Sequence, residues 1–255
     1  MRRSASWWPG VGASVVAVLG ACVLAEPAMA QNIPLVTGTP TAGGGTAYTV
    51  PVQTLLTLSA LSFLPSALML MTSFTRILIV FSLVRQALGL QSMPPNSVLV
   101  ALSLFLTFFV MNPVLEKIQE DAWKPYVAKQ IDLEAAVERG VQPLKAFMVK
   151  HTREADLELF SRLSGLPLTD RASVPLRVLV PAFAISEIRT GFLIGFVIFL
   201  PFVVIDLAVA SILTSVGMVM VSPVMFSLPL KLIIFTLADG WSLLAGSLVN
   251  SYLSR

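Results

Sequence analysis

The residues with the most distinctive chemistry in this chain are two methionines, Met218 and Met220, which stand between Gly217 and Pro223. Thioethers are soft ligands that suit Cu(I), and methionine is also a flexible apolar side chain that packs around varied partners. Glycine and proline both interrupt helices, so the segment predicts a loop between two helices. The pattern therefore allows a copper site or an adaptable apolar surface.

Two isolated charges, Asp206 and Lys231, flank this loop at nearly equal distances along the sequence. If the apolar segments on either side fold back as a hairpin, the two charges reach the same depth. A lone charge in the middle of a membrane costs about 2.5–3.5 kcal/mol on insertion scales, so pairing has a clear driving force. The sequence predicts an intramembrane ion pair.

Elsewhere the sequence offers no catalytic or metal-binding set. His151 is the only histidine and lies on an apolar stripe, while Glu134 and Glu138 stand one helical turn apart in a charged segment typical of a wet surface. There is no GxSxG, no Gly-rich phosphate loop and no paired metal-ligand spacing. We interpret the chain as a non-enzyme without a metal or another cofactor.

The composition indicates a membrane protein. Of the 255 residues, 56% are hydrophobic and 12% are charged, and that charged share is about half the value usual for soluble domains. The formal net charge is +3, with no basic run. A nucleic-acid partner is therefore not expected.

The first thirty residues have the features of a secretory signal. Arg2 and Arg3 precede an apolar core, and Ala28-Met-Ala30 offers small residues for cleavage. The alternative is a lipoprotein box ending at Cys22, but the apolar run continues beyond it, which favours cleavage after Ala30. Cleavage would remove the only cysteine and start the mature chain outside the cytoplasm. A flexible Gly/Thr/Pro-rich lead-in, 31–49, is expected to follow.

Charged residues divide the remaining chain into three parts. The segment 116–189 holds eleven acidic and eleven basic residues, whereas only Arg76 and Arg85 are charged between 50 and 115. Four apolar runs, each long enough to cross about 30 Å of hydrocarbon, lie outside that segment. They are Val50–Met71, Val98–Leu115, Gly191–Leu213 and Val224–Val249.

These observations predict an all-α integral membrane protein. Four hydrophobic, proline-broken helical segments would form two hairpins, 50–115 and 190–255, with a helical soluble insert, 116–189, between them. An external amino terminus places the segment with Arg76 and Arg85 in the cytoplasm and the insert in the periplasm. The prolines in or beside the apolar runs predict broken helices that are protected inside an assembly. They are Pro65, Pro113, Pro181, Pro201, Pro223 and Pro229.

The insert has helix signals of its own. Asp132 is a candidate N-cap for a helix over 133–139 that stops at Gly140. Pro143 suits the first turn of a second, amphipathic helix, whose apolar residues repeat at three- and four-residue steps up to Gly165. His151 lies on that stripe, where packing is the expected role.

Several longer strings resemble the FliP family of flagellar biosynthetic proteins. They include MTSFTRILIVFSLVRQALG at 71–89, PPN at 94–96, FLTFF at 105–109 and TREAD at 152–156. Further matching strings are PAFAISE at 181–187, PFVVID at 201–206, LPLK at 228–231 and DGW at 239–241. The resemblance extends from about Tyr48 to the carboxyl end.

The resemblance implies a subunit of the type III export gate. Members of this family are expected to form a ring, thought to be a pentamer, with FliQ-like and FliR-like membrane subunits. The ring exports unfolded flagellar proteins from the bacterial inner membrane at the flagellar basal body, with much of the assembled complex on the periplasmic side. The family also includes injectisome counterparts.

The family pattern at the loop is three methionines followed by Val-Pro-Pro, regarded as a constriction in the channel. Here the middle methionine is Val219 and the first proline is Ser222. The resemblance assigns the channel gate to Met218 and Met220, with Gly217 and Pro223 as helix breakers. The alternatives are a copper-handling membrane protein that uses the Met-x-Met pattern and an ion-coupled transporter that uses Asp206.

Overall fold

The computed structural model of the chain describes residues 37–40, 46–49, 52–166, 170–171, 173–218 and 222–253. The chain divides into two compact units, residues 1–63 and 64–255. The expected signal peptide, 1–30, lies outside the described residues.

The first unit contains a short β-hairpin. Strands β1 (Thr37–Pro40) and β2 (Thr46–Thr49) pair antiparallel, with Thr37 opposite Thr49. Threonine favours extended backbone, but these strands were not expected from the Gly/Thr/Pro composition of the lead-in. Helix α2 (Val52–Leu70) begins in this unit and continues into the second.

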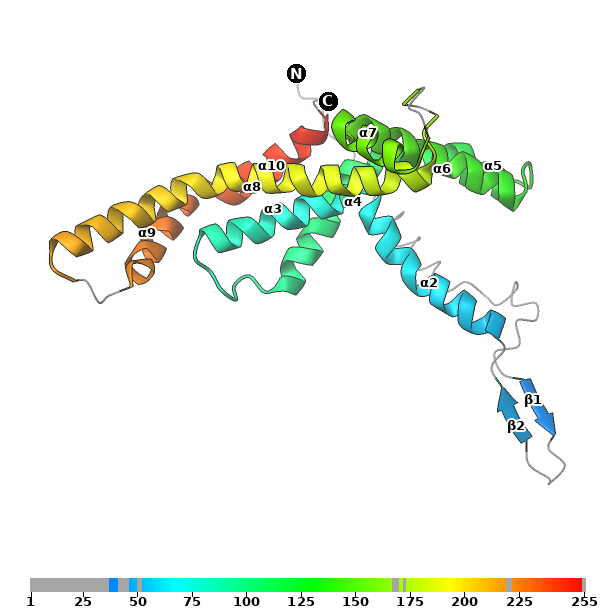
Figure 1. The fold of residues 1–255 in the computed structure, drawn as a ribbon, viewed down its shortest axis with the longest axis horizontal. Helices are drawn as coiled ribbons and strands as arrows, with labels where there is room; N and C mark the ends of the chain where they lie inside the picture. Colours follow the sequence, from blue (N-terminus) through cyan, green and yellow to red (C-terminus); the bar gives the residue numbers. More distant parts are fainter. Residues whose placement is uncertain are drawn as a thin grey trace, which may run out of the picture. The chain divides into compact units, whose positions relative to one another are not determined.

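The described part of the second unit is helical (Figure 1). Its elements in chain order are α3 (Phe74–Ala87), α4 (Asn96–Ile118), a π-helical turn (Gln119–Trp123), α5 (Lys124–Val127), α6 (Leu133–His151), α7 (Glu154–Leu163), α8 (Leu176–Ser215), α9 (Pro223–Leu237) and α10 (Gly240–Leu253).

Two helical stretches among the described residues are long and apolar enough to cross a membrane. They are Asn96–Val127, which begins with α4, and α8. Helices α9 and α10 would form a third span if they act together, although the pair is bent by 62°. The chain is thus a helical membrane protein, but the fourth expected run is two helices rather than one.

The segment that contains Arg76 forms a helix with one buried face. In α3, Ile77, Val80, Phe81 and Val84 are fully buried, and their spacing places them on one helical face. This face packs along α8. The apolar stripe of α3 therefore provides core packing, which was not predicted for this segment.

Prolines do not end the longest helix. Helix α8 has 40 residues and continues through Pro181 and Pro201. It also starts within the expected insert, so no helix boundary exists near residue 190. The break between α9 and α10 instead occurs at Asp239, a non-glycine residue with φ of 49°.

The insert also differs from its expected pattern. Asp132 is the N-cap of α6, and its Oδ1 accepts a hydrogen bond from the Ala135 N–H at 3.0 Å, as predicted. However, α6 continues through Gly140 and Pro143. A side chain at Gly140 would lie 3.5 Å from Ala122 Cβ. This is an ordinary van der Waals distance, so the packing does not require a glycine here, and Gly140 does not stop the helix.

The expected amphipathic helix is divided into α6 and α7 at Thr152 and Arg153. The Thr152 hydroxyl donates to the Met148 carbonyl at 2.6 Å, and the extended Arg153 donates its N–H to Ser186 Oγ on α8 at 3.0 Å. Thr152 also keeps its helical N–H bond to the Met148 carbonyl, whereas the Arg153 N–H bonds to Ser186 in place of a carbonyl of α6, so α6 ends here. The break was missed because Ser186 is distant in sequence.

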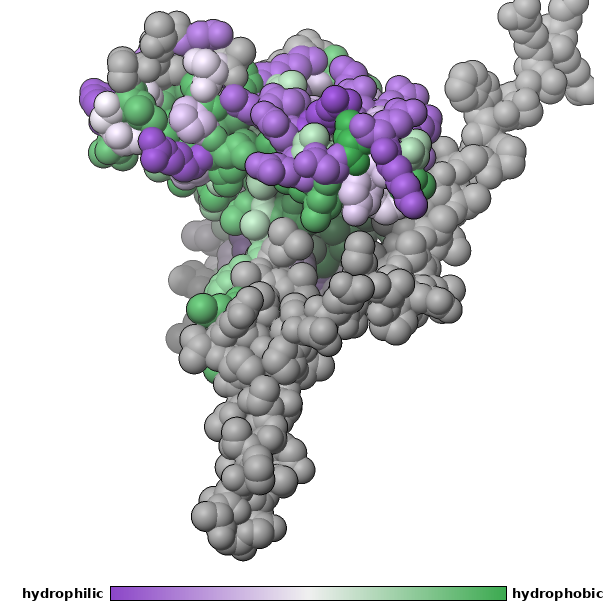
Figure 2. Space-filling model, turned by 90° about the vertical axis from the view of Figure 1, so that its right-hand side faces the viewer, coloured by the Kyte–Doolittle hydropathy of each residue, from purple (hydrophilic) through white to green (hydrophobic). Residues whose placement is uncertain are grey.

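Two apolar clusters form the core of the second unit. One joins α3 to the later parts of α8 and to α9 and α10, while the other joins α4, α6 and α7 to the start of α8. The view onto the end that carries α5–α7 shows hydrophilic side chains gathered over these helices (Figure 2). Polar residues thus concentrate on the insert, as its charge count predicted.

The crossing of α3 and α8 depends on a glycine, and we expect Gly195→Ala to destabilise the protein. A Cβ at Gly195 would lie 2.2 Å from Leu83 Cδ1 and 3.0 Å from Leu83 Cβ, so the Leu83 side chain and the helix backbone that carries it would have to shift. Overpacking of this kind costs about 1–3 kcal/mol. Thermal unfolding of the detergent-solubilised protein should therefore shift to lower temperature.

Gly246→Ala is the matched control, because nothing lies within 4 Å of a Cβ at Gly246 in α10. Alanine favours helix over glycine by about 1 kcal/mol, so this variant should be neutral or more stable. Equal unfolding temperatures for the two variants would contradict the close α3–α8 contact.

Candidate functional site

The methionine loop, the segment 216–222 between α8 and α9, begins with a glycine-dependent helix end. Gly217 has φ of 83°, and its N–H donates to the Thr214 carbonyl at 3.0 Å. The N–H of Met218 donates to the Leu213 carbonyl at 3.0 Å, which completes a Schellman motif. Pro223 then occupies the first position of α9. Both breakers therefore lie at helix ends.

The loop presents apolar side chains at the end of the α8–α9 hairpin. Met218 is 38% exposed, and its neighbour Val216 is 72% exposed. Met225 on the first turn of α9 is 76% exposed. Met220 lies outside the described residues. Within the described part, this end of the hairpin needs a partner or lipid to cover it.

The structure brings Asp206 and Lys231 together below this loop. Lys231 Nζ lies 2.6 Å from Asp206 Oδ2 and also donates to the Ala87 carbonyl at the end of α3, at 3.0 Å. Asp206 Oδ1 accepts a 2.5 Å hydrogen bond from Ser227 Oγ. The Lys231 side chain is 4% exposed and that of Asp206 is 32% exposed. This cluster ties α8 and α9 to α3.

Sequence reasoning missed Ser227 and the Ala87 carbonyl. Ser227 stands four residues before Lys231, one helical turn away on the same face of α9, so helical spacing could have indicated it. No local signal indicates Ala87, because it lies 144 residues from Lys231.

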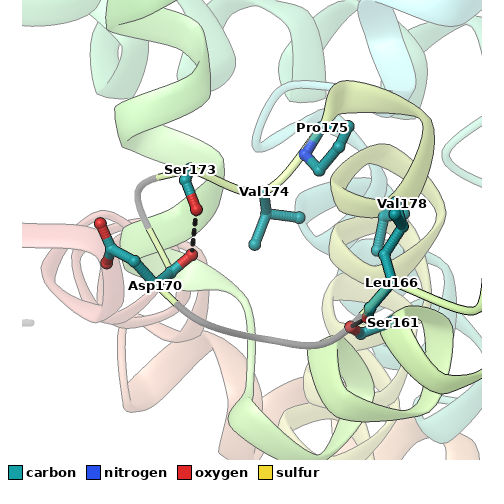
Figure 3. Close-up of a pocket in the computed structure, with 7 residues that line it drawn as sticks. All are labelled: Ser161, Leu166, Asp170, Ser173, Val174, Pro175 and Val178. Carbon is teal, nitrogen blue, oxygen red and sulfur yellow. Dashed lines mark hydrogen bonds between the residues drawn. The ribbon is translucent and has the colours of Figure 1, made fainter.

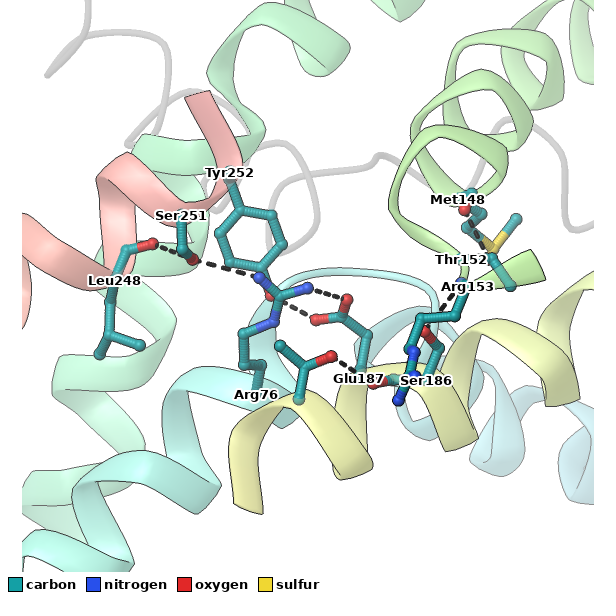
Figure 4. Close-up of polar contacts among 10 residues, drawn as sticks. Arg76, Met148, Thr152, Arg153, Ser186, Glu187, Leu248, Ser251 and Tyr252 are labelled. Atoms are coloured by element: carbon teal, nitrogen blue, oxygen red, sulfur yellow. Dashed lines mark hydrogen bonds and ion pairs between the residues drawn. The ribbon is translucent and has the colours of Figure 1, made fainter. Parts of the chain in front are cut away.

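A second charged cluster lies deeper in the core (Figure 4). Arg76 forms an ion pair through Nη2 with one carboxylate oxygen of Glu187, and the Tyr252 hydroxyl donates to the other oxygen. The Arg76 guanidinium lies 4.0 Å from the centre of the Tyr252 ring, in cation–π geometry, and donates to Ser251 Oγ at 3.1 Å. The side chains of Arg76 and Glu187 are 1% and 0% exposed.

This second cluster connects α3, α8 and α10 and was not predicted. Its sequence signal was the presence of Arg76 and Glu187 as rare charges beside apolar runs. A charge in such a setting requires a partner. Sequence alone could not select the partner, since 111 residues separate the two.

His151 packs in an aromatic group. It is 3% exposed, and its ring centre lies 4.7 Å from that of Phe147 and 5.1 Å from that of Tyr252. Glu134 and Glu138 are both exposed. In the described segments, no three His, Cys, Asp or Glu side chains gather as a metal-binding group.

A cavity of about 210 Å³ lies between α7 and the beginning of α8 (Figure 3). Its lining mixes apolar side chains with two hydroxyls, and Ser173 Oγ donates to the Asp170 carbonyl at 2.9 Å. The lining residues are Ser161, Leu166, Asp170, Ser173, Val174, Pro175 and Val178. The cavity belongs to the insert and contains no residue of the two charged clusters.

The fold and these contacts define a class of protein: a helical membrane protein whose apolar helices are tied by buried ion pairs and whose α8–α9 hairpin ends in an exposed methionine loop. The sequence profile of the FliP family matches residues 56–248. This range covers most of the chain, including both charged clusters except Ser251 and Tyr252. The chain belongs to the FliP family.

Similar proteins bear the name flagellar biosynthetic protein FliP. The protein from Pectobacterium carotovorum subsp. carotovorum is 52% identical over 229 residues, which cover 89% of each chain. That of Bacillus subtilis (strain 168) is 50% identical over 202 residues, covering 79% of this chain and 91% of the relative. Two relatives from Buchnera aphidicola are longer, with 62% and 55% of their lengths covered.

Proposed function

We propose that the chain is a core subunit of the flagellar type III export gate. It would assemble as a ring with FliQ-like and FliR-like partners and provide the channel that exports unfolded flagellar proteins. The proposed location is the bacterial inner membrane at the flagellar basal body, with much of the assembled complex on the periplasmic side. Family membership supports the export role, and the methionine loop carries the proposed gate.

Before assembly, the apolar segments would pair as two hairpins, 50–115 and 190–255, with the insert in the periplasm. The α8–α9 hairpin supports this arrangement, since the ion pair holds its two helices together below the loop. The Asp206–Lys231 contact would keep both charges neutralised at membrane depth.

The proposed gate is the methionine loop at the end of this hairpin. The Schellman motif at Gly217 directs the chain out of α8 without requiring further packing, and Met218 is exposed on the loop. Several copies around an axis would bring flexible thioethers together, where they close against one another and re-pack around a passing peptide. An apolar constriction also excludes ions by dewetting.

We expect the double variant Met218→Ala, Met220→Ala to leak small ions while its complex accumulates normally. Shortened side chains at a pore axis leave a gap that water fills, so the seal is lost while packing is kept. The measurement is ion or small-dye permeability of membranes that contain the assembled complex, without export substrate, together with complex abundance.

Met148→Ala is the matched control, since Met148 is a fully buried core methionine. The same truncation there should cost about 2–5 kcal/mol of stability and reduce complex abundance without a leak. If the loop variant behaves like this control, its methionines pack in a core and the gate proposal is wrong.

A further inference from the structure

Arg85 and Asp239, which lie at the ends of apolar helices, form no ion pair among the described residues. Arg76 pairs with Glu187, and Asp206 pairs with Lys231. No ion pair is formed by Arg85 on α3, nor by Asp239 between α9 and α10, in the described segments. At these two positions each chain therefore carries a cation and an anion that no ion pair within the described residues neutralises.

Asp239 lies at the sharp turn between α9 and α10. Its φ of 49° turns the chain between α9 and α10, and the absent Cβ of Gly240 leaves room for the Phe235 ring, which would otherwise lie 2.3 Å away. Trp241 packs edge-on against Phe235, with ring centres 5.3 Å apart. The position of Asp239 is therefore set by packing on both sides of it.

Asp239 lies close in sequence to exposed apolar residues. The residue is exposed, and the nearby Leu237 and Leu243 are 83% and 64% exposed. No described group donates a hydrogen bond to this carboxylate. Burial of such a surface in an assembly or in lipid would strand the charge unless a cation accompanied the covering partner.

Arg85 is a cation that likewise forms no ion pair among the described residues. It lies in the last turn of α3 and is partly buried, and its Nη1 donates to the Pro94 carbonyl at 3.1 Å and to Asn96 Oδ1 at 2.7 Å. These bonds hold the guanidinium in place, while Nε and Nη2 have no described acceptor. Arginine remains protonated in proteins, so its charge persists on assembly.

Asp239 and Arg85 each lie within about one helical turn of an aromatic contact that joins α10 to α3. Trp241, two residues after Asp239, has its ring centre 6.3 Å from that of Phe81. Phe81 stands four residues before Arg85, a separation of about one helical turn, or 5.4 Å along α3. The side chains of Asp239 and Arg85 form no ion pair within the described part of one chain.

We propose that Arg85 of one copy pairs with Asp239 of the neighbouring copy. Each chain supplies one member of the pair, so a head-to-tail ring satisfies both charges in every copy. A lipid phosphate would neutralise Arg85 and leave Asp239 stranded, which favours a second copy as the occupant. This inference rests on the proposed assembly of several copies and assigns residues to the contact between them.

Cross-linking between differently tagged copies tests the proposed contact. In a Cys22→Ser background, one copy carries Arg85→Cys and the other carries Asp239→Cys, so any cross-link between the tags joins two chains. A short bis-maleimide reagent applied to membranes with the assembled complex should give a tagged heterodimer. Arg189→Cys, at another exposed cation on α8, replaces Arg85→Cys in the control and should give little product.

Charge reversal provides an independent test. Asp239→Arg or Arg85→Asp alone places like charges together and should lower co-purification of the two tags about tenfold, while the double reversal should recover most of the loss. Asn96→Ala removes one acceptor of Arg85 but keeps the charge. The Asn96→Ala variant should therefore associate normally. That result would show that the charge of Arg85 matters for the contact between copies, and not its hydrogen-bonded support of the 88–95 loop.

The outcomes distinguish this contact from the broader function. If the tags co-purify but the Arg85–Asp239 cross-link does not exceed the control, or the double reversal fails to recover association, the pair is wrong and the ring stands. A cross-link from Asp239→Cys to a different membrane subunit also overturns the proposal. If unmodified copies do not co-purify, both the contact and the proposed ring are wrong.

Discussion

Glu187→Gln is expected to leave little folded protein in the membrane. The substitution preserves size but removes the charge that faces Arg76, and the two side chains are 0% and 1% exposed. An unpaired guanidinium at this burial cannot recover its hydration. Breaking a buried pair in this way costs about 3–5 kcal/mol, a large part of the 5–15 kcal/mol that stabilises a typical domain.

The loss of stability in Glu187→Gln would extend beyond one ion pair, because the cluster connects three helices. The Tyr252 hydroxyl on α10 donates to Glu187 on α8, while Arg76 on α3 lies against the Tyr252 ring. A glutamine can satisfy one of these hydrogen bonds but supplies no charge. We expect α10 to separate from the core first, since it is the last helix of the described chain.

The measurement is the amount of membrane-extracted protein and its thermal unfolding, with Glu134→Gln as the control. Glu134 is exposed on α6, so its neutralisation should change the free energy of unfolding by about 0.5 kcal/mol or less. An apolar triple variant, Arg76→Met, Glu187→Leu and Tyr252→Phe, removes every stranded group and should recover much of the loss. Wild-type unfolding of Glu187→Gln would show that the pair is dispensable.

Asp206→Asn is expected to weaken the α8–α9 hairpin and impair assembly. Lys231 is 3% exposed and would lose its charged partner, leaving only neutral acceptors such as the Ala87 carbonyl. Because Asp206 is partly exposed, the cost should lie below that of Glu187→Gln, at about 2–3 kcal/mol. The expected readout is a lower yield of assembled complex with a lower unfolding temperature.

The double variant Asp206→Asn, Lys231→Gln tests whether the effect arises from the pair. Without the ammonium there is no stranded charge, so the double variant should be more stable than Asp206→Asn alone. Ser227→Ala is the graded control, because it removes one hydrogen bond to Asp206 and should cost about 1 kcal/mol. A double variant no better than the worse single variant would argue against direct coupling.

The sequence by itself determined the class of protein and the features that depend on neighbours along the chain. Low charge and long apolar runs predicted a helical membrane protein, and Asp132 was identified as an N-cap from its residue type. The proximity of Asp206 and Lys231 could also be inferred, since both sit at similar distances from a loop marked by Gly217. In a helical hairpin, two residues at equal distances from the connecting loop lie at the same depth. The spacing along the sequence is therefore enough to predict that Asp206 and Lys231 lie close together.

Only the tertiary structure decided what the remaining charges contact and where helices end. Arg76 meets Glu187 because α3 lies against α8, where Gly191 and Gly195 allow a close approach. The burial of α3 was not predicted, since burial on one face requires knowledge of the helix that covers it. Pro181 and Pro201 likewise remain within α8, whereas Asp239 begins a turn that packing around Gly240 maintains. These outcomes depend on contacts between residues that are distant along the chain, and local propensity does not specify such contacts.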